Sequence, residues 1–300
     1  MTSLALLAQL SLFEKLTFTM AAALKIAARM IGGRHALEVL SVLRDVEAQG
    51  NRAYRQGTYT ILQMMPTEEI IEAYQLCLRR YGSDFAVFKQ VFLEKEYLPL
   101  VSFVKMQVEM SEVKYVVDAG ANIGCTTIYL KKVFPTASII SIEPDTQNFQ
   151  ALVKNITINQ LAEVHPVQGG LWSSNEWLTT HHNFRDGRDW SIAVRPAPVD
   201  QSIEARTAIQ GITLDYLLSQ YHFPQIDVLK MDIEGAEQVI FQPDGHVSDF
   251  LERVHFIGME THPELGGQQK VLDTLHAYGF TFFFAGESLI AQNLKFRPIL

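Results

Sequence analysis

A glycine-bearing turn between a short apolar run and a helix-like segment is the feature that most constrains this chain. The run 115–117 (Tyr-Val-Val) leads into 118–124 (Asp-Ala-Gly-Ala-Asn-Ile-Gly), and we expect a helix over about 124–134. Gly120 and Gly124 let the backbone turn tightly and approach a ligand closely. The following helix presents free N–H groups to that ligand. The segment therefore predicts the strand, turn and helix of a nucleotide-binding α/β domain.

Short apolar runs and helical stretches alternate after about residue 111, which indicates βα units around a parallel sheet covered on both faces. The chain closes with two apolar runs separated by Gly286, which predict an antiparallel hairpin at the sheet edge. The polar stretch 176–211 is too long for a simple connection, and we expect a lid or substrate loop there. The expected parallel strands fall at 115–117, 138–142, 226–231 and 254–259, the helices at 124–134, 145–160, 213–221 and 268–278, and the hairpin strands at 280–284 and 288–291.

Residues 1–110 have a different texture, with apolar residues at helical spacings of three and four. Val39, Val42 and Val46 show this spacing, and Thr67 followed by two glutamates is typical of a helix start. We therefore expect two domains. Residues 1–110 form a helical extension with a packing, lid or partner role, and residues 111–300 form the catalytic domain.

A second acid, Glu143, ends the next apolar run, 23 positions beyond Gly120. Nucleotide-binding α/β folds place there the carboxylate that holds ribose hydroxyls. The dinucleotide fingerprint has a glycine at the position of Asn122, so a nicotinamide cofactor is disfavoured. Asp118 also suits the cationic amino end of a methionyl ligand and would repel a pyrophosphate. On this charge argument S-adenosylmethionine (SAM) is the better candidate.

Four motifs together resemble the FkbM family of SAM-dependent methyltransferases: 118–124, Ile-Glu-Pro-Asp at 142–145, Leu-Lys-Met-Asp-Ile-Glu-Gly-Ala-Glu at 229–237, and Glu-Thr-His at 260–262. Their order and intervals match over about 110–295. The resemblance implies a Rossmann-like class I methyltransferase fold, with a mainly parallel seven-stranded sheet and a C-terminal antiparallel hairpin. It also implies SAM as cofactor and, commonly, O-methylation of a hydroxyl on a natural product or sugar.

Site residues follow from the resemblance position by position. The turn residues would surround the methionyl part of SAM, and Glu143 would take the ribose hydroxyls. The Gly-Leu pair at 170–171, which follows the third strand of the family's fold, would lie near the adenine. Asp232 would stand at the mouth of the methyl-transfer site. The implied cofactor-binding residues are Asp118, Gly120, Ala121, Asn122, Gly124, Glu143, Pro144, Gly170, Leu171 and Asp232.

The catalytic candidates are Asp232, Glu234, Glu260 and His262, which follow two strands at one edge of the sheet. The hydroxyl of the acceptor must be oriented and deprotonated, and Asp232 or His262 is the candidate base. Glu234 and Glu260 would orient the substrate. We expect no metal, although these four residues offer mostly hard oxygen ligands that suit a divalent cation. Each acid also has a plain reading as a helix cap, and His262 as a structural histidine.

Charge and composition narrow the partners. The net charge of −8 and the absence of Lys and Arg runs disfavour a nucleic acid. The segment at Asp232 also reads Asp-Ile-Glu-Gly, which is not the motif that holds a base amine. We therefore expect a small-molecule acceptor. Two other classes stay open as alternatives: a nicotinamide-dependent oxidoreductase, and a SAM-binding scaffold without catalysis.

Location follows from cysteine usage and from the N-terminal segment. The isolated Cys77 and Cys125 make no disulfide framework and fit a reducing cytoplasm. The apolar stretch 4–13 is followed by Glu14 and Lys15, so it predicts a packed helix and no stable membrane insertion. Peripheral contact of this helix with a membrane, and the oligomeric state, stay open.

Overall fold

The computed structural model describes residues 33–181, 193–196, 208–233, 235–241, 250–262 and 267–298. The chain divides into two compact units, Met1–Ala53 and Tyr54–Leu300. The described part of the first unit is mainly helix α3 (Gly33–Ala48), which confirms the helix expected from Val39, Val42 and Val46. The apolar stretch 4–13 lies outside the described residues, so its packing stays a prediction.

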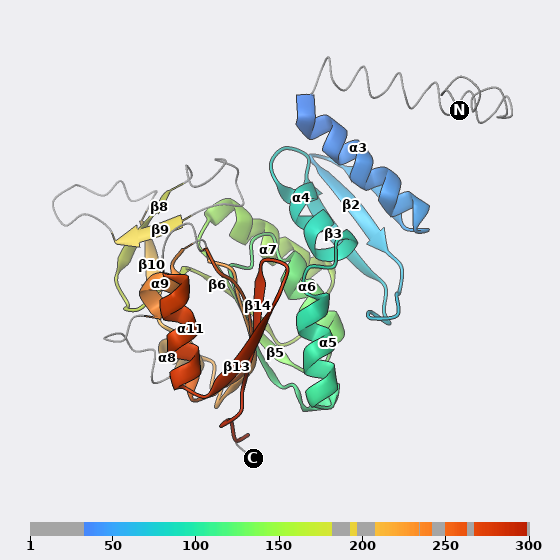
Figure 1. Cartoon of the computed structure of the whole chain (residues 1–300). Coiled ribbons are helices and arrows are strands. Elements are labelled where there is room, and N and C mark those ends of the chain that lie inside the picture. The colour runs from blue at the N-terminus through green and yellow to red at the C-terminus, as the bar shows by residue number, and fades with distance from the viewer. Residues whose placement is uncertain are drawn as a thin grey trace, which may run out of the picture. The chain divides into compact units, whose positions relative to one another are not determined.

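A seven-stranded sheet organises the second unit, in the order β13-β14-β12-β11-β4-β5-β6 (Figure 1). The five strands from β12 to β6 are parallel, whereas β14 and β13 form an antiparallel hairpin at one edge. This confirms the predicted fold class, the four parallel strands and the closing hairpin. The strands are β4 (Tyr115–Ala119), β5 (Ser138–Glu143), β6 (Val164–Gln168), β11 (Ile226–Met231), β12 (Val254–Glu260), β13 (Phe280–Ala285) and β14 (Ser288–Asn293).

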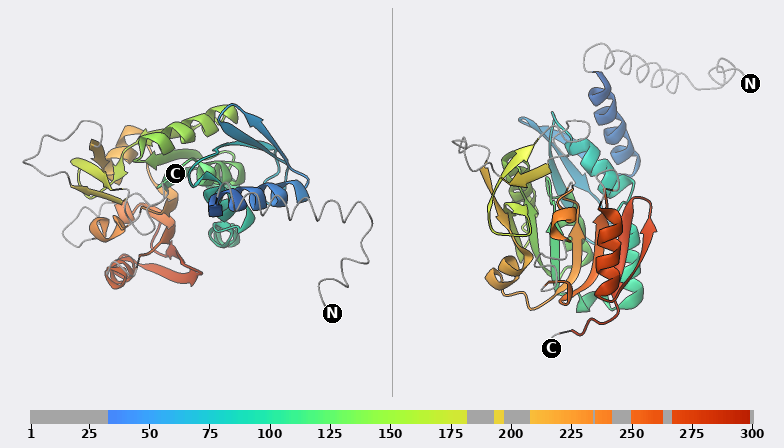
Figure 2. Two further views of the ribbon diagram at one scale, coloured as in Figure 1. Left: turned by 90° about the horizontal axis from the view of Figure 1, so that it is seen from above. Right: turned by 60° about the vertical axis from the view of Figure 1, so that its left-hand side comes forward.

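Helices cover both faces of this sheet, and the predicted helices are confirmed to within a few residues at each end. Asp145 begins α7 as a true N-cap, because its side chain accepts hydrogen bonds from the backbone N–H groups of Gln147 and Asn148. Helix α11 runs beside the closing hairpin in two views (Figures 1 and 2). The helices are α5 (Leu98–Gln107), α6 (Cys125–Val133), α7 (Thr146–Ile158), α8 (Leu214–Gln220), α9 (Glu237–Ile240) and α11 (Gln268–Ala277).

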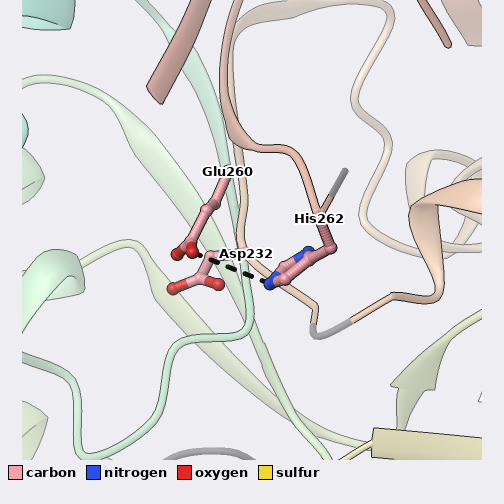
Figure 3. A group of neighbouring side chains, drawn as sticks. All are labelled: Asp232, Glu260 and His262. Atoms are coloured by element: carbon pink, nitrogen blue, oxygen red, sulfur yellow. Dashed lines mark ion pairs between the residues drawn. The ribbon is translucent and has the colours of Figure 1, made fainter. Parts of the chain in front are cut away.

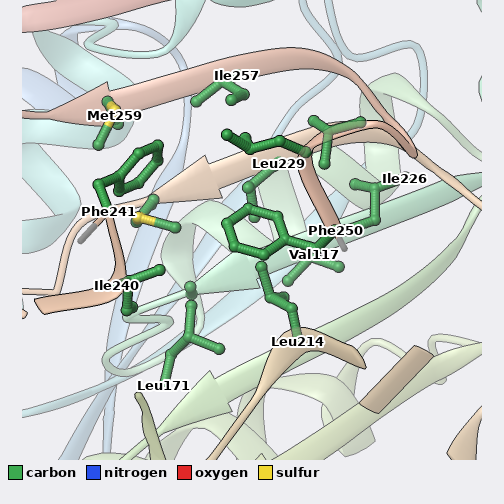
Figure 4. Close-up of a cluster of buried hydrophobic side chains, with 14 of the residues drawn as sticks. Val117, Leu171, Leu214, Ile226, Leu229, Ile240, Phe241, Phe250, Ile257 and Met259 are labelled. Carbon is green, nitrogen blue, oxygen red and sulfur yellow. The ribbon is translucent and has the colours of Figure 1, made fainter. Parts of the chain in front are cut away.

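The main hydrophobic core joins one face of the sheet to α8, α9 and α11 (Figure 4). Val117, Leu229 and Ile257 contribute from three adjacent strands, and Leu214 and Phe241 pack against them. All five side chains are buried. Because parallel strands covered on both faces bury nearly every side chain, they read in the sequence as short apolar runs.

The helical expectation for residues 1–110 is wrong over 52–79. A sheet of three strands lies there, in which β2 and β3 pair antiparallel: β1 (Arg52–Gln56), β2 (Tyr59–Met64) and β3 (Tyr74–Arg79). Thr67 does not begin a helix; its hydroxyl accepts a hydrogen bond from the Ile70 N–H within a turn between β2 and β3. Short apolar runs fit helix and strand equally by spacing, and here a tertiary partner decides.

That partner is α7, which presents two asparagines to the edge of β3. Asn155 and Asn159 each accept a hydrogen bond from a backbone N–H of β3, at 2.7 and 2.8 Å from the nitrogens of Cys77 and Gln75. The side-chain amide of Asn155 also donates to the Cys77 carbonyl oxygen, and that of Asn159 donates to the Gln75 carbonyl oxygen. The side chains thus satisfy an edge that would otherwise stay unpaired. Residues 54–110 accordingly belong to the larger unit, and the units do not divide near residue 110.

The stretch 176–211 also differs from the irregular loop that its composition suggested. Part of it pairs into a small sheet, in the order β7-β10-β8-β9. Residues 182–192 and 197–207 lie outside the described residues, so a lid or substrate role stays a prediction. Across the described ranges, no helix has the length and apolarity that a membrane crossing needs. The strands are β7 (Gly170–Leu171), β8 (Trp177–His181), β9 (Ala193–Pro196) and β10 (Ala208–Ile212).

Candidate active site

The glycine loop, residues 118–124, lies where the order of the sheet strands reverses, between the carboxyl ends of β4 and β11. In open α/β sheets ligands bind at this point. Gly120 has φ +77°, and a Cβ there would lie 1.8 Å from the backbone oxygen of Asp232. Only glycine fits at that position. The loop is fixed from behind, since the N–H groups of Gly120 and Ala121 donate to the Ile142 oxygen at 3.0 and 2.9 Å.

Two further loop residues have left-handed backbone, Asn122 with φ +50° and Gly124 with φ +88°. Asparagine tolerates this conformation better than other side chains, and the Asn122 side chain accepts a hydrogen bond from the Ile123 N–H. Asn155 of α7 donates to the Ile123 oxygen at 2.8 Å. The asparagine that holds β3 therefore also holds the loop.

A buried lysine, Lys230 of β11, holds the loop from below. Its Nζ donates to the Gly120 oxygen at 2.7 Å and to the Ala119 oxygen at 3.3 Å, and lies 3.2 Å from Asp118 Oδ1. The residue is only 1 % exposed. Burial alone lowers the pKa of Lys230, but attraction to Asp118, Asp232 and Glu96 outweighs it and leaves that pKa raised. Lys230 is thus a cation with a structural task.

The pairing with Lys230 changes the reading of Asp118. Asp118 is fully buried, and its other carboxylate oxygen accepts a hydrogen bond from the Thr127 hydroxyl at 2.7 Å. Its charge is balanced inside the protein, so the sequence argument that Asp118 attracts a cationic ligand does not describe this structure. Lys230 was missed from the sequence. An isolated lysine in an apolar parallel strand was the available signal, because a buried cation needs a partner.

Glu143, at the end of β5, lies beside the glycine loop. Its two oxygens accept hydrogen bonds from the N–H groups of Asn122 and Asp145, at 2.8 and 2.9 Å. Burial raises the pKa of Glu143 to about 7, although these two hydrogen bonds oppose the rise. The backbone N–H of Gly169 donates to the backbone carbonyl oxygen of Glu143 at 3.1 Å. The structure thus brings the predicted adenine segment, Gly170 and Leu171, to the same strand end, next to Pro144 and Glu143.

On the other side of the loop lie Asp232, Glu260 and His262, which we name the β11–β12 cluster (Figure 3). One potential ligand atom from each residue lies within 4.8 Å of the other two. The backbone N–H of Asp232 donates to the Ala119 oxygen at 3.1 Å, which ties the cluster to the glycine loop. The structure therefore gathers three of the four catalytic candidates. The fourth, Glu234, lies outside the described residues.

A carboxylate that the sequence did not single out, Glu237 of α9, orients His262. Both residues are buried, and Glu237 Oε1 pairs with His262 Nδ1. His262 Nε2 then faces Glu260, whose Oε1 lies 3.7 Å away. In the sequence Glu237 is the last acid of the motif at 229–237, and acids at a helix start are common, so nothing there marks it as the partner of His262.

A further acid comes from outside the expected catalytic domain. The pKa of Glu96 is raised to about 7, chiefly by burial; the charges of Asp232 and Glu260 contribute to this rise and that of Lys230 opposes it. Its neighbour Tyr97 is buried, with its ring centre 5.7 Å from Lys230 Nζ. In the sequence Glu96 is one of several charged residues between two helical segments, and no motif distinguishes it.

Comparison with known proteins agrees with this geometry. The model of the FkbM methyltransferase domain matches residues 118–282. Methyltransferase sdnD of Sordaria araneosa is 27 % identical over 246 residues, which cover 71 % of this chain and 89 % of that protein. Methyltransferase 1 of Beauveria bassiana (strain ARSEF 2860) is 25 % identical over 183 residues, covering 53 % of this chain and 72 % of that protein.

Among solved structures, the N-terminal domain of human METTL16 in complex with SAH is 12 % identical, with a TM-score of 0.42, and the match covers 87 % of this chain and 82 % of that one. A putative caffeoyl-CoA O-methyltransferase from Staphylococcus aureus is 10 % identical, with a TM-score of 0.39, covering 69 % and 91 %. The family match alone spans more than half of the chain and includes the glycine loop, Glu143 and the whole β11–β12 cluster. This chain therefore belongs to the FkbM family of methyltransferases.

Proposed function

We propose that this protein transfers a methyl group from SAM to a hydroxyl of a small molecule. One observation carries the proposal: the glycine loop and the β11–β12 cluster are in direct backbone contact. A Cβ on Gly120 would collide with the Asp232 oxygen, and the Asp232 N–H bonds to the Ala119 oxygen. A ligand held at the loop therefore has its reactive end next to the cluster.

The charge of the site supports SAM over a nicotinamide cofactor. Lys230 is balanced by Asp118, whereas Asp232, Glu260 and Glu96 face the same region. The surplus of carboxylates attracts a sulfonium and an ammonium group and repels a pyrophosphate. These three acids, and not Asp118 as the sequence suggested, would therefore attract the cationic groups of SAM.

The residues present fit the parts of SAM. Backbone groups of the loop from Gly120 to Gly124 would hold the methionyl part, and Glu143 the ribose hydroxyls. Ala121 and Asn122 complete the loop, and Pro144, Gly170 and Leu171 line the side where the adenine is expected. Glycine at position 120 keeps the backbone open to a ligand, since a side chain there has no room.

When bound, SAM supplies an electrophilic methyl group, and its neutral thioether leaving group needs no proton. The protein has to orient the acceptor hydroxyl, exclude water and remove one proton. Orientation in a closed site contributes up to about 7–11 kcal/mol, and general-base help typically about 10²–10⁴-fold. The β11–β12 cluster is placed for this task, with Asp232 or His262 receiving the proton and Glu260 orienting the hydroxyl. Glu237 would hold the imidazole of His262 in position.

A small-molecule acceptor agrees with the net charge of −8, which disfavours a polyanion. The carboxylates of Asp232, Glu260 and Glu96 also favour a neutral acceptor over an anionic one, so sugars and natural products with free hydroxyl groups are the first class to screen. Labelled SAM with such a panel reveals the acceptor directly.

Calorimetric titration tests the cofactor. We expect S-adenosylhomocysteine (SAH) to bind with a Kd in the micromolar range, NADH not to bind, and Glu143→Ala to weaken SAH binding at least tenfold. Gln168→Ala, at the end of the neighbouring strand β6, is the control for disturbance of the sheet edge. NADH binding, or no binding of either ligand, would overturn the proposal.

A further inference from the structure

We propose that Asp232, Glu260 and His262 form a binding site for one divalent metal cation. This inference rests on the proposed function, because the cation would act on the acceptor hydroxyl at the same site. It replaces the expectation from the sequence that no metal takes part.

The atoms of the β11–β12 cluster lie close enough together to bind one cation. One atom from each residue lies within 4.8 Å of the other two. A cation with bonds of about 2.0–2.6 Å keeps its ligand atoms within about 4–5 Å of one another. The side chains come from two adjacent parallel strands and converge on one space (Figure 3).

Glu237, which is not one of the three proposed ligands, also supports a metal site. Glu237 is 1 % exposed and pairs with Nδ1 of His262. In metal sites a ligating histidine regularly donates its other ring N–H to a carboxylate, which fixes the tautomer and orients the ring. With Nδ1–H directed at Glu237, the lone pair of Nε2 faces Asp232 and Glu260. A lone pair that faces two carboxylates is repelled by them unless Nε2 is protonated or a cation lies between.

The negative charge of Asp232 is not fully balanced by the side chains around it. Asp232 Oδ1 is buried and has no hydrogen-bond partner among the described residues. Lys230 faces the cluster, but its ammonium is already engaged by Gly120, Ala119 and Asp118. A carboxylate oxygen buried without a hydrogen-bond partner is costly, and proteins pair such atoms or coordinate metals with them. A divalent cation would satisfy Asp232 Oδ1.

The ligand types narrow the metal. Two carboxylates and one imidazole combine hard oxygen with one nitrogen, a set that suits Mn²⁺ and also admits Mg²⁺ or Zn²⁺. Three protein ligands leave coordination positions open, as catalytic sites require. A cation there lowers the pKa of a hydroxyl that it contacts. With the cation bound, Asp232 and His262 would act as ligands in place of the base role proposed above, and the acceptor proton would pass to solvent water.

Direct Mn²⁺ titration tests the proposal without any acceptor. The full-length protein is stripped with EDTA, and binding is followed by electron paramagnetic resonance and calorimetry. We expect one Mn²⁺ per chain, with a Kd below about 100 μM, and at least a 100-fold loss in Asp232→Asn and in Glu260→Gln. Glu237→Gln, which touches the metal only through His262, should cost about 10–100-fold.

Glu96→Gln is the matched control, because it removes a nearby negative charge and no ligand; its affinity for Mn²⁺ should fall only a few-fold. SAH binding of the wild-type protein in EDTA reports the proposed function separately, and urea unfolding in EDTA shows that each variant is folded. Absence of Mn²⁺ binding, or equal losses in Glu96→Gln and Asp232→Asn, overturns the metal site while intact SAH binding leaves the methyltransferase proposal standing.

Discussion

The two sides of the site, the glycine loop and the β11–β12 cluster, differ in how their charged side chains are paired. In the glycine loop every buried charge has a partner inside the protein: Asp118 has Lys230 and Thr127, and Glu143 has two backbone N–H groups. In the β11–β12 cluster the carboxylates of Asp232 and Glu260 lie together, and Asp232 Oδ1 has neither a hydrogen bond nor an ion pair within 4.0 Å among the described residues.

In the glycine loop the protein's own groups satisfy the buried charges, whereas in the β11–β12 cluster a bound ligand would satisfy them. A satisfied buried network stabilises the protein and fixes one conformation. Like charges held together cost stability, and such costs persist where function needs them. We therefore expect mutations on the two sides to change the free energy of unfolding in opposite directions.

The largest effect should follow Lys230→Met. This change leaves the fully buried charge of Asp118 without its cation and removes two hydrogen bonds to the loop. Breaking a buried pair from one side typically costs about 3–5 kcal/mol. Urea unfolding should show a loss of stability of that size, or no folded protein at all.

The double variant Lys230→Met with Asp118→Asn provides the control. It removes both charges, so it should recover part of the loss and give a coupling energy well above about 1 kcal/mol. If the two single losses simply add, Asp118 and Lys230 do not act as a pair, and the comparison between the two sides loses its basis.

Gly120→Ala should come next. A left-handed conformation alone costs an alanine about 1–2 kcal/mol, and here a Cβ would also meet the Asp232 oxygen at 1.8 Å. We expect a loss above about 2 kcal/mol in urea unfolding. The matched variant is Gly286→Ala, where φ is +65° and nothing lies within 4 Å. Equal losses in both variants would show that the loop is not packed against Asp232.

Glu143 predicts a pH dependence of cofactor binding. Burial raises the pKa of Glu143 to about 7, so below pH 7 the group is mostly neutral in the free protein. Ribose hydroxyls donate to the ionised form, and therefore SAH affinity should rise with pH. One pKa unit is a factor of ten, so we expect about a tenfold gain in SAH affinity, by calorimetry, from pH 6 to pH 8.

Glu143→Gln should bind SAH more weakly and with much less dependence on pH, which separates Glu143 from other titrating groups. An equally steep profile in this variant would remove Glu143 from the ribose role, while the proposed methyltransferase activity would remain testable by labelled SAM.

The sequence was sufficient for four of the five parallel strands and for the hairpin, because each of these strands is a short apolar run. The edge strand β6 (Val164–Gln168) has no such run and was not among the expected strands. Asp145 depends on its own neighbours, because its N-cap bonds are local. Residues 52–79 show the opposite case. The edge of β3 is satisfied by Asn155 and Asn159, about eighty positions later in the chain, and no local pattern reveals such a partner.

The site divides in the same way. Motifs identified Glu143, Asp232, Glu260 and His262, because strand ends place them by rule. Their partners came from the structure alone: Lys230, Glu237 and Glu96 act through contacts across the fold, where the sequence shows only one more charged residue.

The smallest predicted effect has the opposite sign to the others. Without a divalent cation, Asp232→Asn removes one of the carboxylates that repel each other in the β11–β12 cluster. The change keeps the side-chain shape, so stability should stay level or rise, by up to about 1 kcal/mol at low salt, in urea unfolding with EDTA.

Glu112→Gln, at an exposed position before β4, is the control for total charge and should leave stability nearly unchanged. Added Mn²⁺ should then stabilise the wild-type protein by mass action and leave Asp232→Asn unaffected. A loss of more than about 1 kcal/mol in Asp232→Asn with EDTA would mean that Asp232 is held by the fold as Asp118 is. The two sides of the site would then be built alike, and the cluster would have no need of a cation.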